Sequence, residues 1–166
     1  MLARGLVTAV VVVILDQLSK TAILAFFGGR VFGDRETVTP FFNFALTYNR
    51  GISFGLFNGG AGLNALIFSL AAAAIVAALV YWLSRASSPF LAVAIGLIIG
   101  GAVGNVIDRL RLGAVVDFLD FHYGALHWPA FNLADSAICI GVGAMLLDGL
   151  FRREPHSVES RQRRVD

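Results

Sequence analysis

The chain has 166 residues, of which 57% are hydrophobic and 14% charged, with a formal net charge of +2 and a mean hydropathy of +0.77. A soluble domain of this size cannot bury so much apolar surface, so the composition excludes an ordinary water-soluble protein and favours the lipid bilayer as solvent. It also gives no support to nucleic-acid binding, because no segment resembles a recognition helix or a stacking platform.

Four segments are long and apolar enough to span a bilayer, whose core of about 30 Å needs about 20 helical residues. They are residues 5–27, 63–83, 90–107 and 131–151. The first could be a cleaved signal peptide, but its apolar run continues past Asp16 and no small-residue cleavage site closes it. The sequence therefore predicts one four-helix membrane domain over residues 1–151.

The distribution of arginines predicts the topology. An even number of spans puts both termini on one side of the membrane. The basic tail, residues 152–166, carries five arginines and is predicted to be disordered. Together with Arg4 and Arg85, the tail is expected to face the cytoplasm, and this bias rests mostly on the tail because the opposite side also carries five arginines.

Two segments are expected on the outer side. In the first, Phe42, Phe44, Leu46 and Tyr48 alternate with smaller or polar residues, and an "NRG" turn follows. This pattern predicts a β-hairpin or small sheet over about residues 37–57, with its aromatic face at the headgroup level. The second, residues 108–130, is expected to be a connection that folds back against the bundle. It would bury four apolar residues, Val115, Val116, Phe118 and Phe121.

Polar residues of three predicted helices fall in one layer of the membrane. Counted from the helix ends, Asp16 lies roughly 16 Å deep, Lys20 and Asn105 roughly 22 Å, and Asp135 roughly 24 Å from the cytoplasmic edge. A charged group at a helix centre costs roughly 2.5 to 3.5 kcal/mol, so such groups are usually paired and functional. One water-accessible site beneath the outer surface would explain them all.

Within this layer the spacing of the residues indicates which side chains meet. Asp16 and Lys20 are four residues apart and can pair on one helix face. Two further sets share a face through spacings of three and four: Asn132, Asp135 and Ser136 in one, and Asn105, Asp108 and Arg109 in the other. Gly96, Gly100 and Gly104 recur every four residues and predict close helix packing. A purely structural polar network is the alternative interpretation.

Asp117 is flanked by apolar residues in "VVDFLDF" and can reach Asp135 if the outer connection folds back. Two carboxylates in one low-dielectric site share a proton near neutral pH and can activate water for attack on a carbonyl. Asp120 is an alternative partner, which the spacing alone does not exclude. It lies closer to the wet "HYG" turn and is ranked lower for that reason.

Other chemistries fit the residues less well. His122, His127 and Asp120 could suggest a metal site, but neither "HEXXH" nor a CxxC pair is present. Ser136 lacks a histidine base on its helix. A proton-coupled transporter would need polar groups through the whole bilayer depth, and the apolar inner halves of the predicted helices argue against one. A non-catalytic assembly factor would tolerate Asp-to-Asn changes.

Five blocks resemble those of the lipoprotein signal peptidase family, also called signal peptidase II. They are "DQLSK", "NRGISFG", "GNVIDR", "VVDF" and "FNLADS", in the family's order, from Asp16 to Ser136. The resemblance implies four transmembrane helices with a small outer β-cradle. It implies a monomeric aspartic endopeptidase of the bacterial inner membrane, with its active site near the outer leaflet. Such an enzyme removes signal peptides from diacylglyceryl-modified prolipoproteins, cutting before the lipidated cysteine.

The resemblance also assigns roles to residues. Asp117 and Asp135 match the catalytic pair. The positions that match site-shaping and substrate-positioning residues are Asp16, Lys20, Asn49, Gly51, Asn105, Asp108, Arg109 and Asn132. No cofactor or metal is implied, the expected partners are the lipidated substrates and membrane lipids, and the cyclic peptide globomycin is the expected inhibitor.

Overall fold

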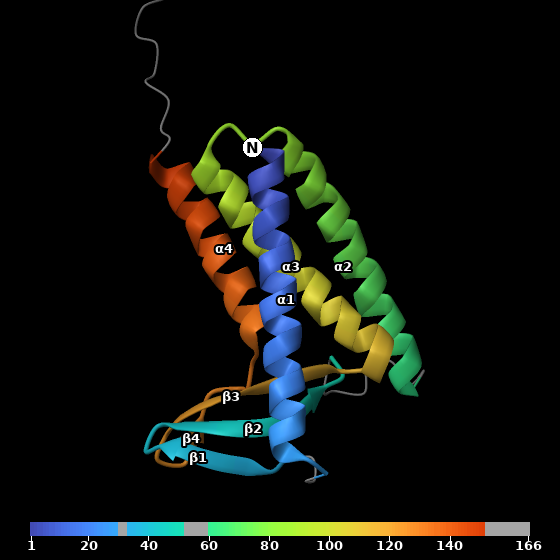
Figure 1. Ribbon diagram of the computed structural model, residues 1–166, viewed down its shortest axis with the longest axis vertical. Helices are drawn as coiled ribbons and strands as arrows, with labels where there is room; N and C mark the ends of the chain where they lie inside the picture. The colour runs from blue at the N-terminus through green and yellow to red at the C-terminus, as the bar shows by residue number, and fades with distance from the viewer. Residues whose placement is uncertain (30–32, 52–59, 152–166) are drawn as a thin grey trace, which may run out of the picture.

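The computed structural model describes residues 1–29, 33–51 and 60–151. Within these ranges the elements are α1 (Leu2–Phe27), β1 (Arg35–Thr39), β2 (Phe42–Asn49), α2 (Gly60–Ser84), α3 (Pro89–Leu112), β3 (Val115–Tyr123), β4 (Leu126–His127) and α4 (Leu133–Phe151). The sheet lies at one end of the helices, and α1 begins and α4 ends at the other (Figure 1). Each helix is long and apolar enough to cross a membrane. The predicted class, four transmembrane helices with a small β element, is confirmed.

The helix boundaries differ from the predicted ones by one to five residues, except for the ends at Phe27 and Phe151, and the largest difference is at the end of α3. The third helix continues past Ile107 to Leu112, so that Asp108 and Arg109 are helical and do not belong to the outer connection. It ends at Gly113, whose left-handed backbone (φ 71°) lets its N–H bond to the carbonyl oxygen of Arg109. The true stop signal is thus this glycine, and not the first charged residue. The fourth helix begins at Leu133, two positions after the predicted start at 131.

The segment between α3 and α4, which was predicted to be a connection, contains a strand, β3. β3 lies inside an antiparallel sheet with the order β1-β2-β3-β4. Its two acidic residues, Asp117 and Asp120, are three positions apart and both are buried, so the strand shows no alternation of apolar and polar residues that would have marked it in the sequence. β2 pairs with β1 on one side and β3 on the other. Residues 52–57 of the predicted β element and the tail, residues 152–166, lie outside the described residues.

The sheet packs on the C-terminal end of α1 through an apolar cluster. The cluster consists of Ile23, Phe27, Leu46, Val116 and Phe118. The predicted burial of Val115, Val116 and Phe118 is confirmed, because each is at most 5% exposed. The prediction was wrong for Phe121, which is 42% exposed. That ring lines an open pocket, together with Phe41 and Trp128, and does not pack into the apolar cluster.

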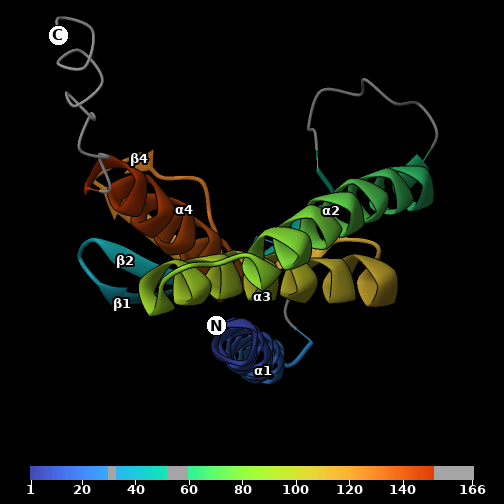
Figure 2. The same cartoon turned by 90° about the horizontal axis from the view of Figure 1, so that it is seen from above.

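α3 is the central helix of the bundle. It contacts each of the other three helices and lies between α1 on one side and α2 and α4 on the other (Figure 2). The predicted glycine row faces α1. A side chain at Gly100 would overlap Ala9, and one at Gly104 would overlap the carboxylate of Asp16. The glycines therefore allow close helix packing and also make room for a buried charged group.

Candidate active site

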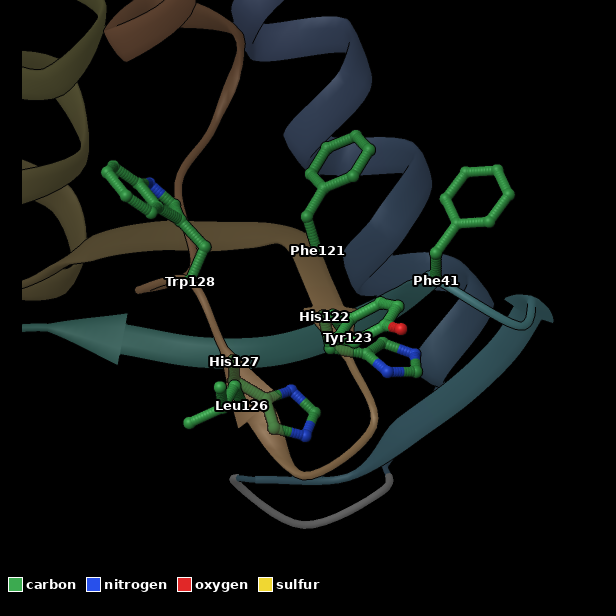
Figure 3. A pocket seen from close by; sticks show the side chains of 7 residues that line it. All are labelled: Phe41, Phe121, His122, Tyr123, Leu126, His127 and Trp128. Atoms are coloured by element: carbon green, nitrogen blue, oxygen red, sulfur yellow. The ribbon is translucent and has the colours of Figure 1, made fainter.

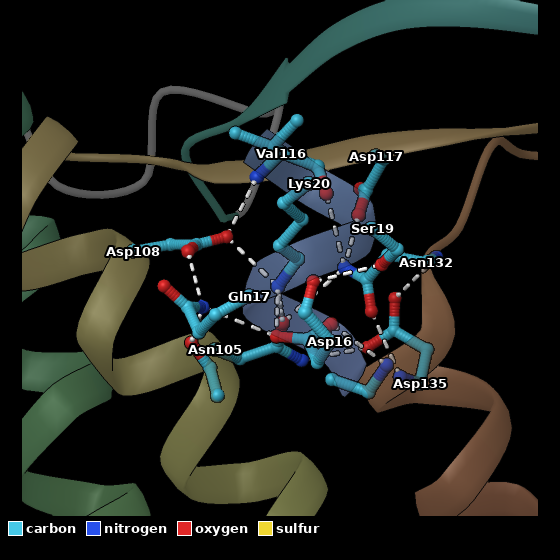
Figure 4. A network of polar contacts seen from close by, with 12 residues as sticks. Asp16, Gln17, Ser19, Lys20, Asn105, Asp108, Val116, Asp117, Asn132 and Asp135 are labelled. Carbon is cyan, nitrogen blue, oxygen red and sulfur yellow. Dashed lines mark hydrogen bonds and ion pairs between the residues drawn. The ribbon is translucent and has the colours of Figure 1, made fainter. Parts of the chain in front are cut away.

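Asp117 on β3 and Asp135 in the first turn of α4 are joined through one residue, Asn132 (Figure 4). The amide Nδ2 of Asn132 donates to Asp117 Oδ1 at 2.7 Å, and its backbone N–H donates to Asp135 Oδ2 at 3.3 Å. Asn132 Oδ1 accepts the backbone N–H of Asp135 at 2.9 Å. The two residues thus cap α4 reciprocally, and the helix dipole favours the carboxylate there. Helix-cap chemistry explains why an acidic residue begins a membrane span.

Backbone pairing brings β3 to this cap. The N–H of Leu119 donates to the carbonyl oxygen of Phe131 at 2.8 Å, and the N–H of Phe131 donates back to Leu119 at 3.2 Å. Asp117 lies two residues before Leu119, and Asn132 follows Phe131 directly. The pairing therefore sets the relative position of the two carboxylates, and it is a contact that residue spacing could not predict.

Asn105 on α3 connects the cap to the interior of the bundle. Its Nδ2 donates to Asp135 Oδ1 at 2.8 Å. Its Oδ1 accepts from Asn132 Nδ2 at 3.2 Å and from Lys20 Nζ at 3.1 Å. Because both donors face the oxygen, the amide has only one orientation, with its nitrogen toward Asp135. The single polar layer predicted from helix depths is confirmed by these contacts.

Below the carboxylate pair lies a buried ionic group. Lys20 Nζ is 2.8 Å from Asp16 Oδ2 and 2.8 Å from Asp108 Oδ2. The predicted pairing of Asp16 with Lys20 is confirmed, and Asp108 joins it as a second anion. All three residues are at most 3% exposed.

The environment of Asp117 favours a bound proton. The carboxyl is 2% exposed, and burial together with the negative charge of Asp135 raises its pKa from 3.8 to about 6. Hydrogen bonds from Asn49 and Asn132 oppose the rise and only partly offset it. An aspartate with such a pKa can hold or release a proton near neutral pH, as water activation requires.

Asp120, the alternative partner, faces the other side of β3 and is engaged elsewhere. It accepts from Asn43 Nδ2 at 3.0 Å, lies 2.8 Å from His127 Nδ1 and lies 3.2 Å from Arg35 Nε. Burial by itself would raise its pKa, but these partners lower the pKa below the usual value. The geometry therefore favours Asp117 as the neighbour of Asp135.

The remaining predicted residues surround the pair. Asn49 bonds to Asp117, and its Oδ1 also accepts the N–H of Gly51 at 2.9 Å. Gly51 has φ +94°, and a side chain there would overlap the ring of Phe68. The guanidinium of Arg109 lies 5.6 Å from the centre of that ring and is attracted by both Asp135 and Asp117.

Sequence reasoning missed Gln17. Its Nε2 donates to Asp16 Oδ2 at 3.2 Å and to Asp108 Oδ1 at 3.0 Å, while its Oε1 accepts from Arg111 at 3.3 Å. Gln17 follows Asp16 directly, so a search for partners three or four residues apart does not find it. The available signal was a glutamine inside an apolar span, which needs a partner as much as a charge does.

The tip of the sheet carries an exposed aromatic surface (Figure 3). It borders a pocket of about 370 Å³ lined by Phe41, Phe121, His122, Tyr123, Leu126, His127 and Trp128. The rings of Phe41, Phe121 and Trp128 point to the same side of the sheet. Among the described residues, no three His, Cys, Asp or Glu side chains are grouped so as to hold a metal ion.

The serine alternative also loses support. The hydroxyl of Ser136 donates to the carbonyl oxygen of Asn132 at 2.9 Å. It is therefore engaged in the helix backbone of α4 and has no histidine partner among its hydrogen bonds in the described part of the chain.

The fold and the site define a multi-pass membrane protein with a carboxylate centre at the sheet end of its helices. Residues 8–151 match the family model described as signal peptidase (SPase) II. The chain therefore belongs to the signal peptidase II family, a family of peptidases of the bacterial inner membrane.

Individual relatives agree with this assignment. The chain is 45% identical over 152 residues to a lipoprotein signal peptidase of Paraburkholderia phymatum, covering 91% of this chain and 90% of the relative. It has the same identity and coverage with that of Burkholderia thailandensis. A solved structure described as a bacterial membrane enzyme, determined in meso at 1.9 Å resolution, superposes with a TM-score of 0.77. It is 35% identical, and the match covers 90% of this chain and 94% of that one.

Proposed function

We propose that this protein is an aspartic endopeptidase that removes signal peptides from diacylglyceryl-modified prolipoproteins, cutting before the lipidated cysteine. The observation that carries the proposal is Asn132, which bonds to Asp117 and to Asp135 at the sheet end of the membrane helices. A lipid-anchored cleavage site lies near the membrane surface, so the groups that activate water must lie at that depth.

The two aspartates act as general base and general acid in turn during the reaction. The ionised carboxylate takes a proton from water as the water oxygen attacks the carbonyl carbon of the scissile bond, and the protonated carboxyl donates to the carbonyl oxygen. When the tetrahedral intermediate collapses, the C–N bond breaks, the carboxyl that took the proton from water gives it to the leaving nitrogen, and the other carboxylate takes a proton from a hydroxyl of the intermediate, which restores the starting pair. The products are a signal peptide with a new carboxyl terminus and a lipidated cysteine with a free amine.

The surrounding residues hold this pair and the substrate. Asn105 and Asn132 orient the carboxylates, while Asn49 supports Asp117 from β2. Arg109 is close enough to stabilise charge on the pair and lies against α2 at Phe68. Within the described residues α2 and α4 make no contact, and we assign the approach of the signal peptide from the lipid to this side of α3.

The same proposal fixes the orientation in the membrane. Both ends of the chain face the cytoplasm, and the sheet lies at the outer leaflet with its aromatic tip at the headgroup level, where amphipathic rings are favoured. The enzyme acts as a monomer without a cofactor. Its expected inhibitor is globomycin.

One experiment tests the activity and separates the rivals. Purified protein is incubated with a diacylated prolipoprotein, and the substrate mass is followed with and without globomycin. A globomycin-sensitive loss of the signal peptide, absent in Asp117→Asn and in Asp135→Asn, is the expected result. A transporter or an assembly factor would leave the substrate mass unchanged even with the wild-type protein, and that result would refute the proposal. Cleavage that persists in Asp117→Asn or in Asp135→Asn would remove that residue from the mechanism.

A further inference from the structure

The buried ionic group beneath the aspartates has a geometry that stability alone does not require. One ammonium group, Lys20 Nζ, is shared equally between Asp16 Oδ2 and Asp108 Oδ2, at 2.8 Å from each. Removing charges from water is costly, and well-packed apolar side chains often stabilise a core at least as well. A buried lysine between two carboxylates therefore calls for another explanation.

The carboxylates of Asp16 and Asp108 each accept a backbone N–H from the residue just before a proposed catalytic aspartate. Asp16 Oδ1 accepts the N–H of Ala134 at 3.0 Å, directly before Asp135. Asp108 Oδ2 accepts the N–H of Val116 at 3.1 Å, directly before Asp117. The same relation thus occurs twice, once on α4 and once on β3.

A third contact of Lys20 acts on the carboxylate pair from below. Nζ donates to Asn105 Oδ1 at 3.1 Å, and the other end of that amide donates to Asp135. All three contacts of the ammonium group therefore lead, through one further residue, to the backbone or carboxylate of the pair.

We propose that Lys20 is a positioning residue that sets the separation of Asp117 and Asp135. This inference rests on the proposed function, because it gives the two aspartates a shared task. Lys20 draws Asp16 and Asp108 together, and they in turn hold α4 and β3 at a fixed spacing. Without the ammonium group the carboxylates of Asp16 and Asp108 repel each other. The contact of Asp16 with α4 and that of Asp108 with β3 can then shift independently.

The test is Lys20→Met, which keeps the length of the side chain and removes its charge and donors. The expected result is a fall in kcat of about 100-fold or more, because misplacing reacting groups by about 1 Å has that effect, with KM changed by less than about threefold. The two apparent pKa values of the pH–rate profile should also move toward each other, since carboxylates that are farther apart interact less.

The change in the two apparent pKa values of the aspartate pair distinguishes a positioning role of Lys20 from the loss of its charge alone. Lys20 faces Asp16 and Asp108, and its charge also acts on Asp117; Arg109 and Asp135 are the other charged groups at the pair. Loss of a positive charge alone would raise both values and leave their separation unchanged. That outcome would overturn the proposal.

A matched control distinguishes this effect from general destabilisation. Ile95→Ala removes a fully buried side chain of α3 that packs against Ala9 and Leu83, away from the polar group. It should lower thermal stability while leaving KM and both apparent pKa values unchanged. If Ile95→Ala narrows the separation as Lys20→Met does, the effect is not specific to Lys20 and the proposal fails.

A second measurement does not depend on cleavage. The protonated carboxyl band of the substrate-free protein is titrated by infrared spectroscopy and assigned by its loss in Asp117→Asn. One possible result is that the wild-type protein cleaves no substrate but the two apparent pKa values of the aspartate pair lie closer together in Lys20→Met than in wild type. The proposed activity then fails and the positioning role stands. If the wild-type protein cleaves and the values do not converge, the positioning role fails.

Should Lys20→Met not fold, Lys20→Arg is measured in the same two ways. Arginine keeps the charge but places a larger, planar fork between the same carboxylates. A lower kcat with a changed separation supports positioning, whereas an unchanged kcat and separation overturn it.

Discussion

Asp117 and Asp120 lie three residues apart on one strand and differ in almost everything except burial. An odd spacing puts them on opposite faces of β3. Each is only 2% exposed. Yet the pKa of Asp117 is raised to about 6, whereas that of Asp120 is lowered below 3.8.

The difference lies in the partners. Asp120 is surrounded by an amide, an imidazole and a guanidinium, from Asn43, His127 and Arg35. Asp117 accepts hydrogen bonds from the amides of Asn49 and Asn132, and the negative charge of Asp135 raises its pKa more than the positive charge of Lys20 lowers it. Burial penalises the ionised form at both sites, and the neighbouring charges decide which form wins. A buried aspartate close to a like charge is prepared for proton transfer, and one among cations is a structural anion.

The largest expected effect is on turnover. Asp117→Asn should lower the cleavage rate by at least about 10⁴-fold, because the amide cannot exchange the proton that general acid–base catalysis needs. Asp120→Asn, an identical change at equal burial, should alter the rate by less than about threefold. The measurement is the mass shift of a diacylated prolipoprotein, with membrane insertion of both variants verified.

If Asp120→Asn abolished turnover and Asp117→Asn did not, the comparison would be reversed and Asp120 would be the partner of Asp135. Equal losses in both variants would mean that the sheet as a whole, and not one face of β3, supports the reaction.

A third buried aspartate extends the comparison. Asp16 has a cation partner, as Asp120 has, so Asp16→Asn should lower stability; because Asp16 also contacts α4 beside Asp135, turnover should fall too, but less than in Asp117→Asn. Breaking a buried pair by removing one partner typically costs about 3 to 5 kcal/mol, and the cost here should be smaller because Lys20 keeps Asp108 as a second partner. Thermal unfolding in detergent would show a clear loss. Full stability with lost turnover would instead move Asp16 to the catalytic group.

Asp117→Asn should have the opposite effect on stability. The folded pKa of Asp117 lies above its unfolded value, so its stabilising contribution is complete below about pH 3.8 and is lost as the pH rises through about 6. The rise corresponds to at most about 3 kcal/mol. At neutral pH the inactive Asp117→Asn variant should therefore unfold at a higher temperature than the wild-type protein, and this gain should disappear in acid. A variant that is less stable than wild type at neutral pH would contradict this account of Asp117.

The sequence predicted the parts of this arrangement that follow from local spacing. Helical periodicity placed Asp16, Lys20, Asn105 and Asp135 at one depth, and the contacts among them confirm it. The choice between Asp117 and Asp120 depends on the face of a strand, and β3 was interpreted as a connection. Its register with β2 and its pairing with Phe131 are long-range contacts, for which the local sequence carries no signal.

The smallest expected effect comes from His127, whose ring supports Asp120 at 2.8 Å. His127→Gln should cost about 1 kcal/mol at neutral pH, since the ring is partly exposed and water screens the pair. The folded pKa of Asp120 is lowered, so its contribution is present above 3.8 and is lost as the pH falls. As the pH falls, the stability of His127→Gln relative to wild type should therefore rise from a negative value toward zero, whereas that of Asp117→Asn falls from a positive value toward zero; turnover of His127→Gln stays unchanged. Thermal unfolding across this pH range measures both trends, and parallel trends for the two variants would show that partners do not distinguish the two aspartates.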